Sequence, residues 1–311
     1  MLNMLKSITT KKERIAIICC LLLTVVSVPA YASYKAYKAE AKEYEQDVAE
    51  ADKHMQEYDA MRDSVVVLED DDESDADIAR RVDFTRLEAK KSNEVSSNVS
   101  DSLFYTNSVK PEEKYDTIDF DKESVKVSDS EDIAGWLYVP GTHIDYIVMR
   151  GTADNDLKYL WQDPYGHASK TGSLFIRYGG DDGSDDHMVI YGHRLKNHKL
   201  YFGELLDYRN EAFAREHDKA YFYTKDGTVT EYYLRTVNEG LETDMIYSYP
   251  FKVNTSGYDM LIEDLGKTQV HCIEEIDNDR EMLVLSTCSG DHSNMPDRLY
   301  LIFQKERVEQ Y

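Results

Sequence analysis

The chain has 311 residues, of which 60 are acidic and 36 are basic, so its formal net charge at pH 7 is −24. Proteins bind the phosphates of nucleic acids mainly through Lys and Arg, so we expect no nucleic-acid partner. The length accommodates one domain of ordinary size together with additional segments.

The first 32 residues have the pattern of a membrane signal-anchor. The stretch from Ile15 to Ala32 is apolar except for two hydroxyl residues and a proline, and it is just long enough to span a bilayer. The residues before it include Lys6, Lys11, Lys12 and Arg14. Because acidic residues follow, we expect a cytoplasmic N-terminus (1–14), a transmembrane segment (15–32) and an extracellular remainder. The alternative is a signal peptide cleaved after Ala30-Tyr31-Ala32, which has the small-x-small form of a cleavage site.

A helix is predicted from Tyr34 to about Arg62, where the sequence favours helix and contains neither Gly nor Pro. Residues spaced by four and three form a heptad seam: Tyr37, Ala41, Tyr44, Val48, Ala51, Met55 and Tyr58. The seam covers only about three heptads and includes Ala and Tyr, which makes a stable coiled coil a poor fit. We therefore expect a juxtamembrane stalk helix that packs loosely or against a partner.

An acidic linker is predicted after this helix. Glu69 to Asp77 contains seven carboxylates in nine positions, and Ser92 to Ser102 is rich in Ser and Asn. The acidic run lacks the spaced ligands and central Gly of a calcium loop. Residues 33–128 are therefore expected to form an extracytoplasmic helical stalk and linker, and residues 129–311 a folded domain.

The folded domain is predicted to be mainly β, because short apolar runs alternate with turn signals. The expected strands are Ile133 to Val139, Ile144 to Met149, Ser173 to Arg177, Met188 to Tyr191, Tyr221 to Thr224, Val229 to Val237, Met282 to Cys288 and Leu299 to Phe303. Helical segments are expected at Asn155 to Leu160, Glu211 to Glu216 and Tyr258 to Leu265, the last with Met260, Leu261 and Leu265 facing a sheet. A closed barrel of about eight strands fits this count, since closure removes exposed strand edges.

Three residues at strand ends have the chemistry of acyl transfer. Cys288 ends an apolar run, Arg298 opens the next one, and His193 follows the strand that ends in Tyr191-Gly192. Each residue alone has a common structural explanation, since an isolated Cys in a strand is usually a small buried hydrophobe. In combination they supply a nucleophile, an acid/base and a fixed cation.

The chemical roles follow from the residue types. A free thiol titrates near pH 8.5, so a neighbouring cation is needed to favour the reactive thiolate near neutral pH. A thiolate attacks a peptide carbonyl, and a protonated imidazole gives its proton to the leaving amine. The planar guanidinium of Arg298 suits the oxyanion or the substrate carbonyl better than an ammonium would.

These motifs resemble those of sortases, and the whole set resembles class B sortases over about Asp132 to Lys305. The resemblance is carried by Leu285-Ser286-Thr287-Cys288 with Arg298, by Tyr191-Gly192-His193, and by the segment from Gly135 to Val148. It implies a closed eight-stranded sortase-type barrel with a helix between the sixth and seventh strands, where Tyr258 to Leu265 lies.

The resemblance also implies site roles. Cys288 corresponds to the nucleophile, His193 to the acid/base and Arg298 to the residue that stabilises the oxyanion and substrate, while Ser286 and Thr287 correspond to substrate-binding positions. This chain departs from the family pattern at three places, namely Val284, Arg194 and Phe175-Ile176-Arg177. None of these is a catalytic position, so the departures bear on substrate choice rather than on activity.

No cofactor and no metal are expected. His187, His198, His217 and His271 lack the spacing of zinc ligands. His292 and Asp291 lie in the loop before Arg298, and the sequence leaves their roles open. Cys19 and Cys20 belong to the apolar stretch, and a disulfide between Cys272 and Cys288 would inactivate the nucleophile.

The resemblance implies a membrane-anchored cysteine transpeptidase of a Gram-positive cell wall. Its partners would be surface proteins bearing a C-terminal sorting signal, cleaved after Thr, and a cell-wall precursor or peptidoglycan amine. A pilin polymerase that uses a lysine amine is the alternative, although the Asp-Pro-aromatic lid of pilus-forming class C sortases does not precede Trp136. A non-catalytic peptide-binding module is a third reading. We expect Asn-Pro-x-Thr or Ser-Pro-x-Thr signals to be preferred.

Overall fold

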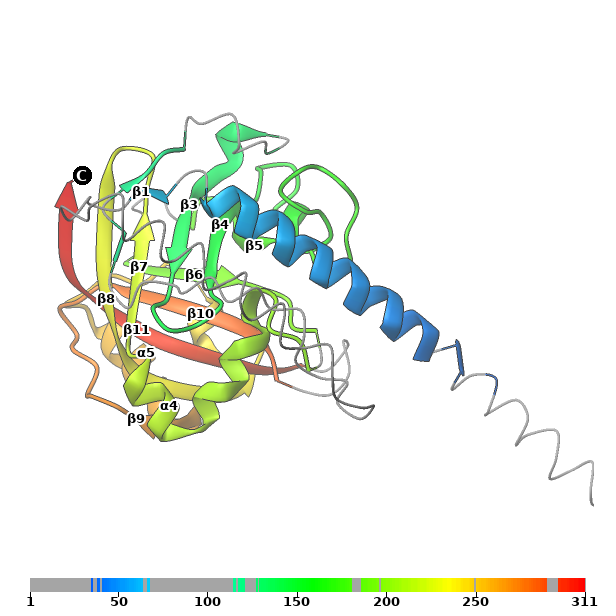
Figure 1. Ribbon diagram of the computed structural model, residues 1–311. Helices are drawn as coiled ribbons and strands as arrows, with labels where there is room; N and C mark the ends of the chain where they lie inside the picture. The colour runs from blue at the N-terminus through cyan, green and yellow to red at the C-terminus, as the bar shows by residue number, and fades with distance from the viewer. Residues whose placement is uncertain are drawn as a thin grey trace, which may run out of the picture. The chain divides into compact units, whose positions relative to one another are not determined.

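The computed structural model of the chain is shown in Figure 1. It describes residues 35, 38–39, 41–63, 66–67, 114–115, 117–120, 127, 129–180, 186–195, 197–248, 250–289 and 296–310. The predicted anchor with its cleavage site, the two linker stretches, and the loop residues Asp291 and His292 lie outside these ranges. Within them, no helix is both long and apolar enough to cross a membrane. The chain divides into two compact units, Met1–Glu50 and Ala51–Tyr311.

A closed β-barrel of eight strands forms the centre of the second unit (Figure 1). Its strands are β3 (Ile133–Tyr138), β4 (Asp145–Arg150), β5 (Leu174–Ile176), β6 (His187–Tyr191), β7 (Lys219–Tyr223), β8 (Thr228–Leu241), β10 (Met282–Cys288) and β11 (Asp297–Gln310). They are ordered β11-β10-β6-β5-β4-β3-β7-β8, and pairing of β8 with β11 closes the ring. The predicted eight-stranded barrel is therefore confirmed, because every expected strand is present.

Two of the barrel strands extend beyond their predicted ends. Strands β8 and β11 are each 14 residues long and pair from Thr228↔Gln310 to Leu241↔Asp297. The prediction ended β11 at Phe303 because charged residues follow. In the structure, cross-strand ion pairs accommodate those charges, as between Arg307 and Glu231 at 3.1 Å.

Three short strands were not predicted. Strand β9 (Gln269–Cys272) pairs with the far part of β8, beyond the segment that pairs with β7. A separate two-stranded sheet joins β1 (Val66–Val67) to β2 (Thr117–Ile118). Strand β9 is mostly exposed, so it lacks the apolar alternation from which strands are predicted.

Strands β3 and β4 form part of the barrel core, and almost all of their residues are buried. Strands buried on both faces read as continuous apolar runs rather than alternating ones. Strand β4 contributes a buried carboxylate to this core: Asp145 accepts hydrogen bonds from Trp136 Nε1 at 2.8 Å and from the Tyr115 hydroxyl at 2.7 Å. The buried carboxylate is thereby compensated.

The helices lie in the connections between strands. They are α4 (Glu211–Glu216), α5 (Ser256–Thr268) and the short 3-10 helices η1 (Ser130–Asp132), η2 (Lys158–Leu160), η3 (Tyr201–Arg209) and η4 (Met245–Tyr247). Helix α5 lies between β8 and β10, the sixth and seventh barrel strands, as the resemblance implies. The helix expected from Asn155 is only the three-residue turn η2.

The buried face of α5 differs from the prediction by one residue. Tyr258, Leu261 and Leu265 are buried, whereas Met260 is 58% exposed. Residues three and four apart share a helix face, so Tyr258 rather than Met260 aligns with Leu261 and Leu265. The hydroxyl of Thr255 accepts a hydrogen bond from Tyr258 N and caps the helix.

The predicted stalk helix is present over residues 41–63, and its portion from Ala51 onward belongs to the unit that contains the barrel. Ala51, Tyr58 and Met61 are buried in the main hydrophobic core. The Tyr58 ring packs edge-on against Tyr146 at 4.9 Å and against Tyr201 at 5.7 Å. Of the two expected arrangements, loose packing or packing against a partner, the part of the seam from Ala51 to Tyr58 shows the second, with the barrel as its partner.

Polar contacts reinforce this docking. His198 Nε2 lies 3.0 Å from Asp52 Oδ1, and Arg62 lies 3.7 Å from the buried Asp145 carboxylate. His54 is buried, with Nδ1 3.3 Å from the Thr171 hydroxyl. The helix therefore contacts the β4–β5 connection, which contains Thr171, as well as the barrel wall.

Candidate active site

The three predicted catalytic residues occupy adjacent strands at one end of the barrel. Cys288, the last residue of β10, is paired directly with Arg298 of antiparallel β11. On the other side, β6 runs parallel to β10 with Ser286 opposite Tyr191. His193 lies two residues beyond Tyr191, and Cys288 lies two residues beyond Ser286, so both residues closely follow the last paired position of these two strands. Because neighbouring strands are about 4.8 Å apart, imidazole, thiol and guanidinium gather at one strand end.

The imidazole of His193 is fixed by one backbone carbonyl. Its Nε2 atom lies 2.8 Å from Leu160 O. A carbonyl only accepts hydrogen bonds, so Nε2 carries a proton and Nδ1 is the atom through which the neutral ring exchanges one. The geometry therefore selects both the tautomer and the nitrogen available for chemistry.

The environment of His193 favours the neutral ring. Burial lowers the pKa of this imidazole below its ordinary value, and the positive charge of Arg298 lowers the pKa further. The hydrogen bond to Leu160 O acts in the opposite direction, because it strengthens when the ring is charged. Negative charge in the site, as on a thiolate or an oxyanion, would therefore stabilise the imidazolium further.

Ser286 and Thr287 are both buried, and their hydroxyls contact neighbouring protein groups. Thr287 Oγ1 donates a hydrogen bond to Gly192 O at 2.9 Å, and Ser286 Oγ lies 2.7 Å from the Tyr247 hydroxyl. Gly192 immediately precedes His193, so Thr287 connects the residue before the thiol to the residue before the imidazole. These contacts position the site, and the substrate-binding role of the two residues stays a prediction.

The guanidinium of Arg298 is oriented by an acidic residue that sequence analysis missed. Arg298 Nη2 donates to Glu242 Oε2 at 2.6 Å, and Nη1 donates to Asp297 O at 3.1 Å. Glu242 N in turn donates to Pro296 O at 2.8 Å, which holds the acidic residue beside β11. Glu242 follows β8 and lies 56 residues before Arg298, and no local sequence signal links the two.

The role of Leu160 was also missed, because a contact through a backbone carbonyl leaves no side-chain signature. The nearby Gly172, at φ +57°, is the one indirect signal. A Cβ atom at this position would lie 2.5 Å from Leu160 O and 2.6 Å from Tyr159 O. Glycine therefore permits the close approach of the chain to the carbonyl that holds His193.

Two of the histidines that lack the spacing of zinc ligands, His187 and His271, contact backbone carbonyl oxygens. His187 Nε2 lies 2.8 Å from Ile246 O and His271 Nε2 lies 2.6 Å from Arg209 O. In the described part of the chain, no group of three His, Cys, Asp or Glu residues is arranged to hold a metal ion. The expectation that the enzyme needs no metal or cofactor stays a prediction.

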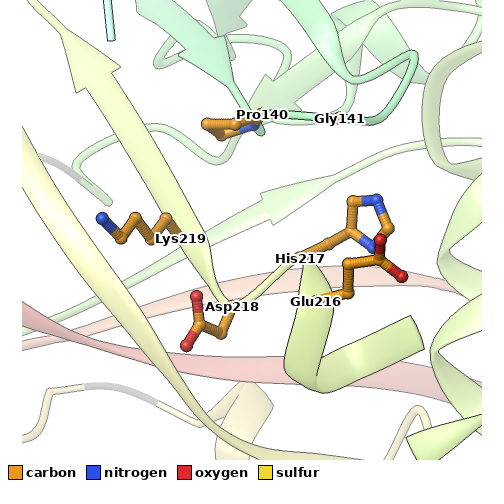
Figure 2. Close-up of a pocket in the computed structure, with 6 residues that line it drawn as sticks. All are labelled: Pro140, Gly141, Glu216, His217, Asp218 and Lys219. Atoms are coloured by element: carbon orange, nitrogen blue, oxygen red, sulfur yellow. The ribbon is translucent and has the colours of Figure 1, made fainter. Parts of the chain in front are cut away.

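A cavity of about 310 Å³ lies between the β3–β4 turn and the α4–β7 connection (Figure 2). It is lined by Pro140, Gly141, Glu216, His217, Asp218 and Lys219. His217 Nδ1 lies 2.9 Å from Phe213 O within its own helical segment. None of the three predicted catalytic residues lines this cavity, so it is separate from the candidate active site.

The arrangement at the barrel end suits transfer of an acyl group through a thioester. The thiol of Cys288 is half-buried and therefore reachable by a peptide, unlike an inert core cysteine. The neighbouring strand ends carry an imidazole whose Nδ1 can accept a proton and a guanidinium held by Glu242, the latter on the residue paired with Cys288. These are the requirements for covalent catalysis with an acid/base and an oxyanion stabiliser.

Comparisons with known proteins agree with this chemistry. A family model for the sortase domain matches residues 137–305. Sortase B of Staphylococcus aureus (strain NCTC 8325 / PS 47) is 24% identical over 179 residues, which cover 56% of this chain and 70% of that protein. Sortase B of Listeria monocytogenes is 25% identical over 174 residues, which cover 55% of this chain and 69% of that protein.

The fold agrees as well. The solved Staphylococcus aureus sortase B–substrate complex matches with a TM-score of 0.51 and 21% identity, and the match covers 57% of this chain and 81% of that structure. His193, Cys288 and Arg298 all lie within the residues matched by the family model.

Proposed function

Because this chain belongs to the sortase family, as a class B member and a cysteine transpeptidase, we propose that it cleaves a C-terminal sorting signal after Thr and joins the protein to a cell-wall amino group. The acyl group would pass through a thioester on Cys288. The observation that carries this proposal is the register of β6, β10 and β11: Cys288 is paired with Arg298, and His193 follows two residues after Tyr191, which is paired with Ser286 of β10.

The first half-reaction forms the thioester. His193 Nδ1 takes the proton of the Cys288 thiol, and the sulfur attacks the carbonyl carbon of the Thr residue. Arg298 stabilises the oxyanion while the C–S bond forms. The C–N bond then breaks, and the imidazolium returns its proton to the leaving amine.

The second half-reaction reverses these steps with another amine. The incoming amine attacks the thioester carbon, gives a proton to His193 and forms a new peptide bond. The C–S bond breaks, and the thiol of Cys288 is restored. No net proton or electron is gained or lost, so the residues at the barrel end suffice for the reaction.

We also propose that the enzyme is held in the cell membrane by residues 15–32, with its N-terminus in the cytoplasm and the barrel outside. The apolar stretch and the basic residues before it support this topology. The partners would then be surface proteins bearing sorting signals, and the acceptor would be an amine of a cell-wall precursor or of peptidoglycan. The intact mass of the membrane-extracted protein tests the anchor, since a mature chain that begins at Ser33 contradicts it.

A panel of quenched peptides tests the reaction and its substrate. The full chain in detergent is incubated with Leu-Pro-x-Thr-Gly, Asn-Pro-x-Thr and Ser-Pro-x-Thr-Gly peptides, and the Cys288→Ala variant is the control. We expect cleavage after Thr, with one of the last two peptides preferred, and loss of cleavage in the variant. Cleavage by Cys288→Ala above about a thousandth of wild type contradicts the assigned nucleophile.

The identity of the preferred acceptor amine distinguishes cell-wall anchoring from pilin polymerisation. Glycine-based and diaminopimelate-based amines are compared with a lysine side-chain amine in a folded pilin. Preference for the lysine amine would favour the pilin polymerase. Failure of a thiol-reactive probe to label Cys288 in the folded protein would favour a module that only binds peptide.

A further inference from the structure

The exposed indole of Trp161 adjoins the catalytic imidazole, and we propose that it forms the subsite for the residue that bears the reacting amine. The leaving residue of the sorting signal would contact it first, and the incoming amine would contact it second. This inference rests on the proposed function, because it assigns a binding surface for the two amines of that reaction.

The position of Trp161 distinguishes it from the other tryptophan of the chain. Trp136 is fully buried in the barrel core, whereas Trp161 is 57% exposed. The centroids of the Trp161 and His193 rings lie 5.1 Å apart, with an angle of 47° between the ring planes. The Trp161 ring therefore contacts the proposed acid/base residue, His193, and is also exposed to solvent, where a ligand can reach it.

The backbone beneath the indole is fixed at several points. Trp161 O accepts a hydrogen bond from Ser169 N at 3.0 Å, and the preceding carbonyl, Leu160 O, accepts one from His193 Nε2. Gln162 forms a β-bridge with Ala168. A large apolar ring held in water on a rigid segment is a feature of binding surfaces, because exposure gives no stability to the isolated protein.

The reaction itself brings the amine to this place. To give its proton to the leaving nitrogen, the imidazole must approach that nitrogen to about 3 Å. The substituents on the nitrogen then lie within reach of a ring whose centroid is 5.1 Å from the imidazole. The incoming amine loses its proton to the same imidazole, so it occupies the same position.

The chemistry of the indole indicates which amines it favours. An ammonium group within about 6 Å of a Trp face is attracted by the ring quadrupole, and Trp is the strongest partner among the aromatic residues. The ligand class is therefore a primary amine that arrives as an ammonium ion, at a peptide N-terminus or on a side chain. Such a contact retains the acceptor until the ammonium group gives one proton to solvent. The neutral amine then attacks the thioester and gives its second proton to His193 as the new C–N bond forms.

The test measures how the thioester partitions between water and an amine. The full chain in detergent is acylated with the preferred peptide, and triglycine is varied as the acceptor for wild type, Trp161→Ala, Trp161→Phe and Leu157→Ala. Leu157 is the matched control, because it flanks the same η2 turn and is 48% exposed. Both aminolysis and hydrolysis products are quantified.

We expect Trp161→Ala to raise the KM for triglycine by about three- to thirty-fold, the range of a cation–π contact, with a smaller effect on kcat at saturating triglycine. The ratio of aminolysis to hydrolysis should fall accordingly. Trp161→Phe should recover part of the loss, and Leu157→Ala should resemble wild type.

Three results would overturn the inference. An equal fall in hydrolysis and aminolysis would mean that Trp161 only supports His193. An unchanged KM for triglycine in Trp161→Ala, or an equal loss in Leu157→Ala, would assign the subsite elsewhere. If wild type forms no thioester with any peptide, the proposed function itself fails, and this outcome is distinct from the other three.

Discussion

Arg298 affects the site both through its charge and through the geometry of its guanidinium. Its charge lowers the pKa of His193, while its planar group is oriented by Glu242 and by Asp297 O. Substitutions that keep the charge and those that remove it therefore separate the two contributions.

Arg298→Lys keeps the charge but loses the planar group. We expect the rate of peptide cleavage to fall by about 100-fold or more, the typical cost of losing an oxyanion donor. His193→Ala should fall at least as far, because the leaving amine then lacks a proton donor. An activated ester, whose leaving group needs little protonation, should restore much of the rate in His193→Ala and little in Arg298→Lys. Equal restoration in both variants would show that the two roles are assigned wrongly.

Arg298→Gln removes the charge and should raise the pKa of His193. A nearby positive charge disfavours the imidazolium, so its removal favours protonation, and the released Glu242 carboxylate acts in the same direction. The pKa should remain below its ordinary value of about 6.5, because burial is the larger cause of the shift. NMR titration of the imidazole protons measures this, with Arg298→Lys as the control that should titrate like wild type. A lower pKa in Arg298→Gln would contradict the stated electrostatics.

The lowered pKa of His193 determines how this residue makes the free energy of unfolding depend on pH. The unfolded chain binds a proton at this residue near pH 6.5, whereas the folded chain does so only at lower pH. Between these two values the unfolded state holds more protons, so the free energy of unfolding falls as pH decreases through this window.

At the scale of elements, apolar patterning was sufficient to predict that each of the eight barrel strands exists. The run from Met282 to Cys288 matches β10 without error, and Glu211 to Glu216 matches α4, because local signals bound both segments. The strand β9 and the charged half of β11 could not be predicted in this way. Their place in the sheet depends on pairing with β8, which is remote in sequence.

The N-terminal helix shows a second limit of prediction from sequence patterns. Its heptad seam predicted an apolar face, but periodicity identifies a face and not its partner. In the structure, Tyr58 packs against both Tyr146 and Tyr201, which also contact each other, and its hydroxyl lies 3.3 Å from that of Tyr201. Tyr201 also donates a hydrogen bond to Gly172 O at 2.8 Å. The helix therefore supports the segment that places Leu160 O against His193.

Tyr58→Ala should detach this part of the helix from the barrel. Truncation of a buried aromatic side chain costs about 3–5 kcal/mol, and the helix can limit that cost by local undocking. We expect faster amide hydrogen exchange over residues 51–63 and a lower Tm, together with slower peptide cleavage. Gln56→Ala, at an exposed position of the same helix, should show none of these changes. Full exchange protection in Tyr58→Ala would show that the seam does not hold the helix.

At the scale of the whole molecule, the active site depends on how the barrel closes. His193 and Cys288 are 95 residues apart, yet the parallel pairing of β6 with β10 places the two strands that lead to them side by side. The pattern of two neighbouring strands joined by a loop predicted that Cys288 and Arg298 lie close together, whereas the placement of His193 with them rested on the resemblance. The acidic partner of Arg298 could not be found by either route, because it lies on a connection after β8.

The barrel also separates the two cysteines of the folded domain. Cys272 pairs with Thr236, Thr236 with Ile302, and Ile302 with Val284, which lies four residues before Cys288. Three strand spacings of about 4.8 Å and four residues of about 3.3 Å separate the two positions, whereas a disulfide requires Cα atoms within about 7 Å. Both thiols are free in the structure, and Cys272 is exposed.

Oxidation should therefore modify the two cysteines independently. In oxidised glutathione we expect mixed disulfides at Cys288 and Cys272, with loss of activity that follows modification of Cys288 alone. Cys272→Ser should retain the activity of wild type within about twofold and lose it at the same rate under oxidation, because an exposed strand position contributes little to stability. Peptide mass spectrometry identifies the products. A peptide linked between residues 272 and 288 would require the β8–β11 pairing to open, since no shorter path joins the two thiols in the closed barrel.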